Sequence, residues 1–236
     1  MKKHPVFFLL KIHRVFFLAA ALPFLFAMTP SAPAARTTIV ALGDSTTAGT
    51  PAFRSPIEAP PNGAGDERSQ YAYWLMQRHP EWQVLSRGVN GERTDEIADR
   101  FDRDVLAVHP RLVIMLGGVN DVYQGLRADV VTRHLRAIYD RAEAAGIQVI
   151  ALSIIPYNTA TPKQNAEMHE INAWIAAQAK SDARITFVDT RAAVAAAGNL
   201  DRLAGSPDGL HPDVEGYRKM ALAMEPAIAR ALSARP

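Results

Sequence analysis

The sequence contains no cysteine, which excludes a disulfide framework, a thiolate zinc site and a cysteine nucleophile. Aromatic residues are scarce, at 8% of the 236 positions. Apolar residues make up 48% and charged residues 21%, a balance that is typical of a globular chain and not of a disordered or low-complexity one. The length suits a single α/β domain with one additional segment.

Acidic residues are absent from the first 34 positions, which carry four basic ones, Lys2, Lys3, Lys11 and Arg14. An apolar run of 14 residues follows over 15–28, and Ala32-Pro33-Ala34 forms a small-residue A-x-A pattern. As a helix this run would rise about 21 Å, short of the roughly 30 Å hydrocarbon core of a bilayer. We therefore predict a cleaved secretory signal peptide over 1–34 and export to the periplasm or the medium. A retained membrane anchor and a core helix interrupted by Pro23 are the alternatives.

The net charge depends on this leader. Removing residues 1–34 takes away four positive charges and no negative ones, so the formal net charge changes from +2 to −2. Nucleic acid then has no compositional support as a partner. We expect no nucleic-acid partner for residues 35–236, and no integral membrane span once the leader is removed.

From residue 37 onward, short apolar runs alternate with segments whose apolar residues recur at helical spacing. The predicted strands are Thr37–Leu42, Trp82–Leu85, Leu112–Leu116, Gln148–Ser153 and Ile185–Val188. The predicted helices are Ser69–Arg78, Thr94–Val108, Ala128–Ala144, Lys163–Ala179 and Asp213–Leu232. Strands that are apolar without alternation are expected to be buried on both faces. Five strand–helix units predict a doubly wound, five-stranded parallel sheet in one domain over residues 35–236.

One connection departs from this alternation. The segment 46–68 is rich in proline and glycine, among them Pro60, Pro61, Gly63 and Gly65, and shows little periodicity. Connections of this length are uncommon in compact domains and are usually functional or mobile. Two interpretations remain open, a mobile surface insertion and a lid or rim over a site.

Four short, polar, glycine-containing segments follow predicted strands or precede the last predicted helix. They are Gly43-Asp44-Ser45, Arg87-Gly88-Val89-Asn90-Gly91, Gly117-Gly118-Val119-Asn120-Asp121 and Asp208-Gly209-Leu210-His211-Pro212. In open parallel sheets, ligands bind beyond the carboxyl ends of the strands. We therefore expect the four segments to meet at one rim.

Together these segments contain the parts of a serine hydrolase. Ser45 leaves a strand and starts a helix, so its hydroxyl can be exposed, and His211 can take up its proton. Asp208 lies three residues before His211 and can hold the imidazole in one tautomer. The candidate donors to a developing oxyanion are the Ser45 and Gly88 N–H groups and the Asn120 amide. Each residue alone is also explained as a turn or helix cap, but their joint occurrence in this order favours catalysis.

The segments ALGDSTTAG, RGVNGERT, LGGVND and DGLHP resemble the four signature blocks of the GDSL/SGNH hydrolases, over nearly the whole chain from about residue 38. The resemblance implies a three-layer α/β/α, flavodoxin-like sandwich, the SGNH hydrolase fold. It also implies a Ser45–His211–Asp208 triad, an oxyanion hole of Ser45, Gly88 and Asn120, and hydrolysis of carboxylic esters or thioesters without a metal or cofactor. The first block reads GDST where many members read GDSL, a departure that affects packing behind the serine and not the chemistry.

The substrate remains open within this class. Small aryl or alkyl esters, lysophospholipid-type acyl esters and thioesters would need an apolar acyl groove, whereas a carbohydrate O-deacetylase would need a shallow polar cleft. Tyr123 and Tyr157 follow the third and fourth strands, where they can line a substrate pocket. The sequence carries no sign of an oligomeric state.

Two other classes of protein are alternatives to a hydrolase. A non-catalytic binding module that retained the fold would be indicated by loss of a triad member, and none is lost. A nucleotide-binding domain would need a G-x-G-x-x-G turn after the first strand, where this chain has GDSTTAG.

Overall fold

The computed structural model describes Met1 and residues 35–233. The predicted signal peptide therefore lies, apart from Met1, outside the described residues. Within the described part of the chain, no helix is both long and apolar enough to cross a membrane.

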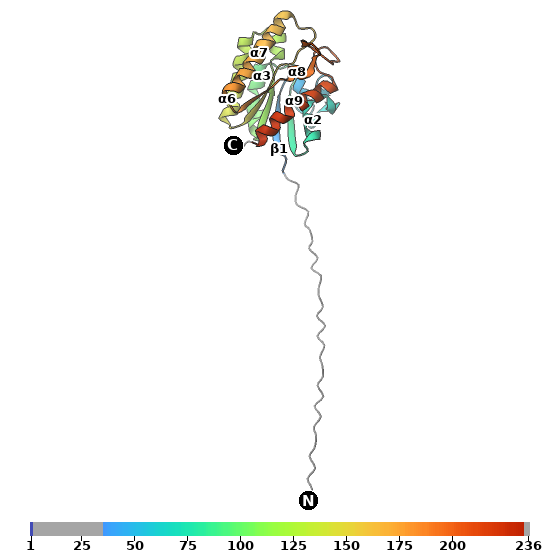
Figure 1. The fold of residues 1–236 in the computed structure, drawn as a ribbon, viewed down its shortest axis with the longest axis vertical. Coiled ribbons are helices and arrows are strands. Elements are labelled where there is room, and N and C mark those ends of the chain that lie inside the picture. Colours follow the sequence, from blue (N-terminus) through green and yellow to red (C-terminus); the bar gives the residue numbers. More distant parts are fainter. Residues whose placement is uncertain (2–34, 234–236) are drawn as a thin grey trace. The chain divides into compact units, whose positions relative to one another are not determined.

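A five-stranded parallel sheet forms the centre of the domain (Figure 1). Its strands are β1 (Thr37–Gly43), β4 (Trp82–Gly88), β5 (Leu112–Leu116), β6 (Gln148–Leu152) and β7 (Ile185–Val188). They lie in the order β4-β1-β5-β6-β7, and every neighbouring pair is parallel. Counted along the chain this is the order 2-1-3-4-5 of flavodoxin-like sheets. The five predicted strands and the doubly wound arrangement are confirmed.

Helices cover both faces of the sheet and complete the three-layer α/β/α sandwich (Figure 1). One face carries α3 (Thr94–Asp99), α6 (Ala128–Ala144) and α7 (Pro162–Ser181). The other carries α2 (Tyr71–Arg78), α8 (Thr190–Val194) and α9 (Val214–Ser233).

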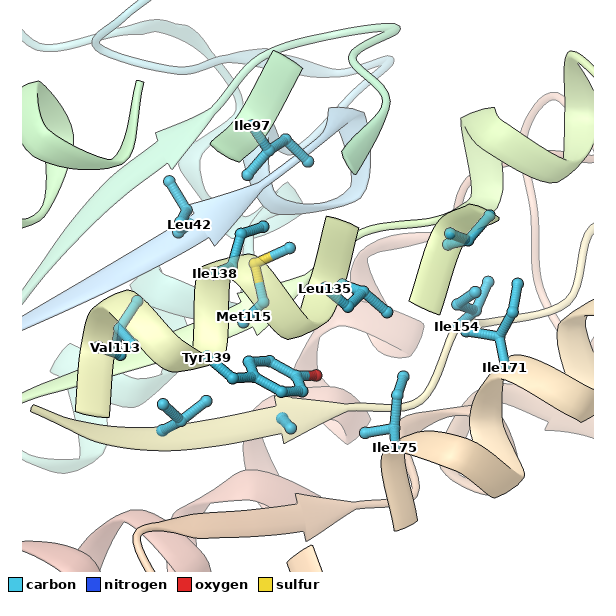
Figure 2. Packing of buried hydrophobic residues seen from close by; sticks show 14 of the residues in the cluster. Leu42, Ile97, Val113, Met115, Leu135, Ile138, Tyr139, Ile154, Ile171 and Ile175 are labelled. Carbon is cyan, nitrogen blue, oxygen red and sulfur yellow. The ribbon is translucent and has the colours of Figure 1, made fainter. Parts of the chain in front are cut away.

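The core has two halves because successive strand residues point to opposite faces of the sheet. In β1, Val40 and Leu42 belong to the half packed by α6 residues such as Ile138 (Figure 2). Ile39 and Ala41 belong to the half that contains the α9 residues Tyr217, Met220 and Met224. Both sets of strand residues are fully buried, which is why the strand sequences show no polar alternation.

The helix predicted over Thr94–Val108 is wrong as a continuous element. The chain forms α3, then α4 (Phe101–Asp104) and a 3₁₀ turn at Leu106–Val108. At the break, Arg100 has φ −97° and ψ 7°, outside regular helix geometry, and its buried side chain bonds to the ends of two strands. This long-range contact outweighs the local helical pattern.

Several short elements were not predicted because they are too short to show a periodicity. They are α5 (Val119–Tyr123), α8, a 3₁₀ turn at Glu67–Ser69, and two hairpins, β2 (Phe53–Arg54) with β3 (Ala64–Gly65) and β8 (Ala195–Ala196) with β9 (Asn199–Leu203). The helix expected to start at Ser45 is α1 (Ser45–Ala48). The segment 46–68 thus contains most of α1, the first hairpin and most of the 3₁₀ turn.

Candidate active site

Two glycines allow the ends of β1 and β4 to be packed closely. A Cβ atom at Gly43 would overlap the Leu116 carbonyl oxygen, and one at Gly88 would overlap the backbone of Ala48 in α1. Only glycine therefore lets α1 lie directly against both strand ends. This packing places the first residue of α1, Ser45, at the carboxyl edge of the sheet.

Ser45 is the first residue of α1, and Asp44 is its N-cap. The Asp44 Oδ1 atom accepts a hydrogen bond from the Thr46 N–H at 2.9 Å, the usual role of an aspartate at this position. The Ser45 side chain is nearly buried. As predicted from the glycine-bounded turn, the backbone leaves β1 just before Ser45 and starts a helix there.

The structure brings Ser45, His211 and Asp208 together in a hydrogen-bonded row. His211 Nε2 lies 2.9 Å from Ser45 Oγ, and His211 Nδ1 lies 2.7 Å from Asp208 Oδ2. Ser45 and His211 are 3% and 4% exposed, so these two residues are shielded from bulk water, whereas Asp208 lies at the exposed end of the row. The distances lie within hydrogen-bond range for a nucleophile, a base and an orienting group.

Asp208 is held in its ionised form. Partial burial of the carboxyl opposes ionisation, but hydrogen bonds from the His211 ring and from the His211 and Leu210 N–H groups outweigh it, and the pKa falls to about 2. A carboxylate only accepts hydrogen bonds. Neutral His211 therefore carries its proton on Nδ1 and presents Nε2 as an acceptor to the Ser45 hydroxyl.

The loop that carries Asp208 and His211 is braced from within and from outside. Ser206 Oγ donates to the His211 carbonyl at 2.6 Å and accepts from the Gly209 N–H at 2.8 Å. From the loop after β6, the Asn158 N–H donates to the Gly209 carbonyl at 2.7 Å. These bonds fix the loop backbone beneath the imidazole.

The predicted oxyanion donors lie at the carboxyl ends of β1, β4 and β5: Ser45 begins α1, Gly88 ends β4, and Asn120 lies in α5. Ser45 and Gly88 sit at adjacent strand ends, where β1 and β4 are paired through Gly43 and Gly88. The Asn120 Nδ2 group donates to the Glu92 carbonyl at 2.8 Å. A side-chain amide has two N–H groups, so this bond leaves the second one as the donor that the prediction requires.

The segment 46–68 is bonded to the loop that follows β4. Ser55 is fully buried and its Oγ donates to the Gly88 carbonyl at 2.6 Å. Glu58 accepts the Asn90 N–H at 2.8 Å. The segment thus supports the Gly88 loop, and its action as a lid stays a prediction.

Tyr123 and Tyr157 contact each other edge to face, with ring centroids 5.8 Å apart. Tyr123 is 59% exposed, whereas Tyr157 is buried and its hydroxyl has no hydrogen-bond partner within residues 35–233. Tyr157 directly precedes Asn158, which bonds to the loop that carries His211. Their part in a substrate pocket stays a prediction.

Three side chains of metal-ligand type gather outside this row. Asp95, Asp121 and His134 place ligand atoms within 4.8 Å of one another. Asp121, however, already accepts the Thr94 N–H at 3.0 Å and the Thr94 hydroxyl at 2.6 Å, and Asp95 pairs with Arg93. These polar groups satisfy one another, and the cluster is explained as a support for the start of α3.

Asp44 is a buried carboxyl next to the candidate nucleophile. Burial raises its pKa to about 7; the charge of Asp121 adds to this rise, and the Thr46 hydrogen bonds and the Arg100 charge oppose it. Its Oδ2 atom has no hydrogen-bond partner in the described part of the chain. The buried phenols that share its surroundings, Tyr71 and Tyr217, have pKa values above their ordinary 10.0.

We predict that Asp44→Asn stabilises the protein selectively at alkaline pH. The raised pKa of Asp44 gives stability that is fully present below its ordinary value of 3.8 and is lost as the pH rises through about 7. Asparagine keeps the acceptor for the Thr46 N–H but cannot ionise. The free energy of unfolding of the variant, relative to wild type, should rise by on the order of 2–3 kcal/mol between pH 5 and pH 8.5. Urea unfolding at both pH values measures this, and an equal difference at the two would contradict it.

Sequence reasoning missed the residues that support the site from below. Arg100 falls inside a helix predicted from the sequence, and Ser55 and Ser206 belong to none of the recognised motifs. A buried arginine and two loop serines carry no local signal, because their partners are carbonyl groups distant in the sequence or in irregular loops.

Comparison with known proteins assigns the chain to a family. Residues 41–219 match the GDSL-like lipase/acylhydrolase family, and the chain belongs to this family. No curated protein matches the chain.

Solved structures share the fold. A lipolytic protein of the G-D-S-L family from Desulfitobacterium hafniense DCB-2 is 26% identical, with a TM-score of 0.66 over 81% of this chain and 99% of the other. A GDSL-like lipase from Bacteroides thetaiotaomicron VPI-5482 is 23% identical, with a TM-score of 0.65 over 83% and 89%. A catalytic mutant of an acetylxylan esterase from Geobacillus stearothermophilus is 20% identical, with a TM-score of 0.63 over 85% and 96%. The α/β/α architecture is therefore that of the SGNH hydrolases.

Proposed function

We propose that the protein is a serine ester hydrolase in which Ser45 is the nucleophile, His211 the general base and acid, and Asp208 the group that orients His211. The observation that carries this proposal is the hydrogen-bonded row from Ser45 Oγ through both ring nitrogens of His211 to Asp208. Membership of the acylhydrolase family supports it. We also propose that residues 1–34 direct export and are then removed.

The reaction follows from this geometry. Ser45 Oγ attacks the ester carbonyl as His211 Nε2 takes up its proton, and the imidazolium is stabilised by ionised Asp208. The negative charge on the carbonyl oxygen is received by the N–H groups of Ser45 and Gly88 and the amide of Asn120. His211 then protonates the leaving alcohol, which leaves an acyl-enzyme. A water molecule, deprotonated by His211, then attacks the acyl carbon. The bond from this carbon to Ser45 Oγ breaks, His211 returns the proton to Oγ, and the carboxylic acid is released.

The proposed substrates are carboxylic esters of small aryl or alkyl alcohols or of lysophospholipid type, and thioesters are chemically compatible with the same steps. Exposed Tyr123 beside buried Tyr157 offers an aromatic surface for an apolar substrate group. A carbohydrate O-deacetylase is the second candidate, because the fold is shared with an acetylxylan esterase.

An acyl-chain series of p-nitrophenyl esters, assayed with purified residues 35–236, tests the proposal. We expect hydrolysis together with covalent labelling by a fluorophosphonate, because both reactions need an activated serine. A maximum at C2 would favour aryl or sugar acetates, and a maximum at C8 or longer would favour lipid esters. The absence of both hydrolysis and labelling would contradict the proposal and would favour a non-catalytic binding module.

A further inference from the structure

Arg100 is a buried cation placed between two strand ends. It is 7% exposed, and its guanidinium donates to the Arg87 carbonyl and the Gly43 carbonyl, each at 2.8 Å. Its Nε donates to Glu92 at 2.6 Å and its Nη1 to Asp104 at 2.7 Å. Every nitrogen of the fork therefore has an acceptor, and two carboxylates balance its charge.

The bond to the Arg87 carbonyl acts on a peptide group that the proposed reaction uses. The Arg87 C=O and the Gly88 N–H belong to one planar peptide unit. A donor fixed on the carbonyl sets the orientation of that plane and hence the direction of the N–H. A charged donor also polarises the peptide, which strengthens its N–H as a hydrogen-bond donor.

Glu92 connects the same guanidinium to a second proposed oxyanion donor. The Glu92 carboxylate binds Arg100 Nε, and the Glu92 backbone carbonyl accepts from Asn120 Nδ2 at 2.8 Å. With one amide N–H held by this carbonyl, the direction of the other is set by the planar amide group. The position of Glu92 thus orients Asn120.

We propose that Arg100 is the positioning residue of the oxyanion hole: it orients the Gly88 N–H through the Arg87–Gly88 peptide plane, and the Asn120 amide through Glu92. This inference rests on the proposed function and adds to it a residue that contacts neither the substrate nor the row of Ser45, His211 and Asp208. Its effect is confined to the charge that develops on the carbonyl oxygen in the transition state.

Arg100→Lys tests this role, because lysine keeps the charge between Glu92 and Asp104 but cannot reproduce the fork. We expect kcat for p-nitrophenyl acetate to fall about 10- to 100-fold, since misplacing a preorganised donor approaches the cost of removing it. KM should stay within about twofold, because the ground-state ester carries no oxyanion. The pH dependence should not move, since Asp208 and His211 are untouched.

Arg103→Lys is the matched control. Arg103 also binds Asp104, at 2.7 Å, but is 66% exposed in its side chain, and within residues 35–233 it bonds to neither strand-end carbonyl. We expect its kcat to equal that of wild type. A comparable fall in Arg103→Lys would assign the effect to Asp104 and overturn the proposal.

The remaining outcomes are decisive as well. A folded Arg100→Lys with kcat within about twofold of wild type, or with a raised KM alone, overturns the proposal. Should Arg100→Lys not fold, Glu92→Ala replaces it, because Glu92 is partly exposed. The kcat of Glu92→Ala should fall about 3- to 10-fold at constant KM, and an unchanged kcat overturns the proposal.

Ser45→Ala, assayed alongside, separates failure of the proposed function from failure of this inference. Activity that survives in Ser45→Ala removes the proposed function and this inference with it, whereas activity lost there but kept in Arg100→Lys removes this inference alone.

Discussion

Ser45→Ala should lower the hydrolysis of p-nitrophenyl acetate by at least about 10⁴-fold, because loss of the nucleophile leaves only the oxyanion donors and substrate binding to act. The Ser45 hydroxyl bonds to His211 Nε2, and removing one oxygen atom leaves α1 and its Asp44 cap in place. The change should therefore appear in kcat and not in the far-UV circular dichroism spectrum or the thermal midpoint. Steady-state kinetics and thermal melts of both proteins measure this.

Ser181→Ala is the control for Ser45→Ala. Ser181 is the last residue of α7, is exposed, and bonds to carbonyls of its own helix, so its loss removes the same atom far from the sheet edge. It should keep wild-type activity and label with a fluorophosphonate, whereas Ser45→Ala should not. Wild-type turnover by a folded Ser45→Ala protein would rule out Ser45 as the nucleophile.

Asp208→Asn should lower kcat/KM by about 10³- to 10⁴-fold although the side chain keeps its shape. An asparagine amide facing His211 Nδ1 would donate a hydrogen bond, which drives the ring proton to Nε2. The ring nitrogen that lies 2.9 Å from Ser45 Oγ would then be a donor and could not accept the serine proton. The variant would also lose the negative charge that stabilises the imidazolium. Kinetics from pH 5 to pH 9 measure this.

Asp213→Asn is the matched control for Asp208→Asn. Asp213 accepts the Gly216 N–H at 2.7 Å at the start of α9, a capping role in which asparagine serves as well as aspartate. It should keep activity and stability near wild type. Equal losses in the two variants would assign the effect to loop stability and not to the tautomer of His211.

The strands and the site were predictable because their signals are local. Each core strand is an uninterrupted apolar run, and β1, β4 and β5 each lead into a polar, glycine-containing segment. In a parallel sheet such segments are bound to meet at one edge. The approach of the segments that carry Ser45, Gly88 and Asn120 therefore followed from the strand order. Asp208 and His211 follow none of these strands, and their place at the same edge was expected from the resemblance of all four segments to the family's signature blocks.

The hydrogen bonds from Arg100 and Ser55 that support the site were not predictable, because each joins a side chain to a backbone carbonyl distant in the sequence. Arg100 interrupts an expected helix to reach carbonyls 57 and 13 positions away, and Ser55 bonds to Gly88 across 33 positions. Carbonyl groups are present at every residue, so no side-chain pattern marks the ones that are used. The same limit explains why the segment 46–68 could be located but its contacts with the β4 loop could not.

The two hydrogen bonds that link Ser45, His211 and Asp208 span very different distances along the sequence. His211 and Asp208 are three positions apart, so their bond closes a very short loop at little entropic cost. Ser45 and His211 are 166 positions apart, and their bond forms only when β1, α1 and the segment before α9 are all docked. Under the proposed function, the fraction of molecules that a serine-directed reagent labels then equals the fraction that is completely folded. Such titration would count native molecules in a preparation more strictly than any spectroscopic measure of helix content.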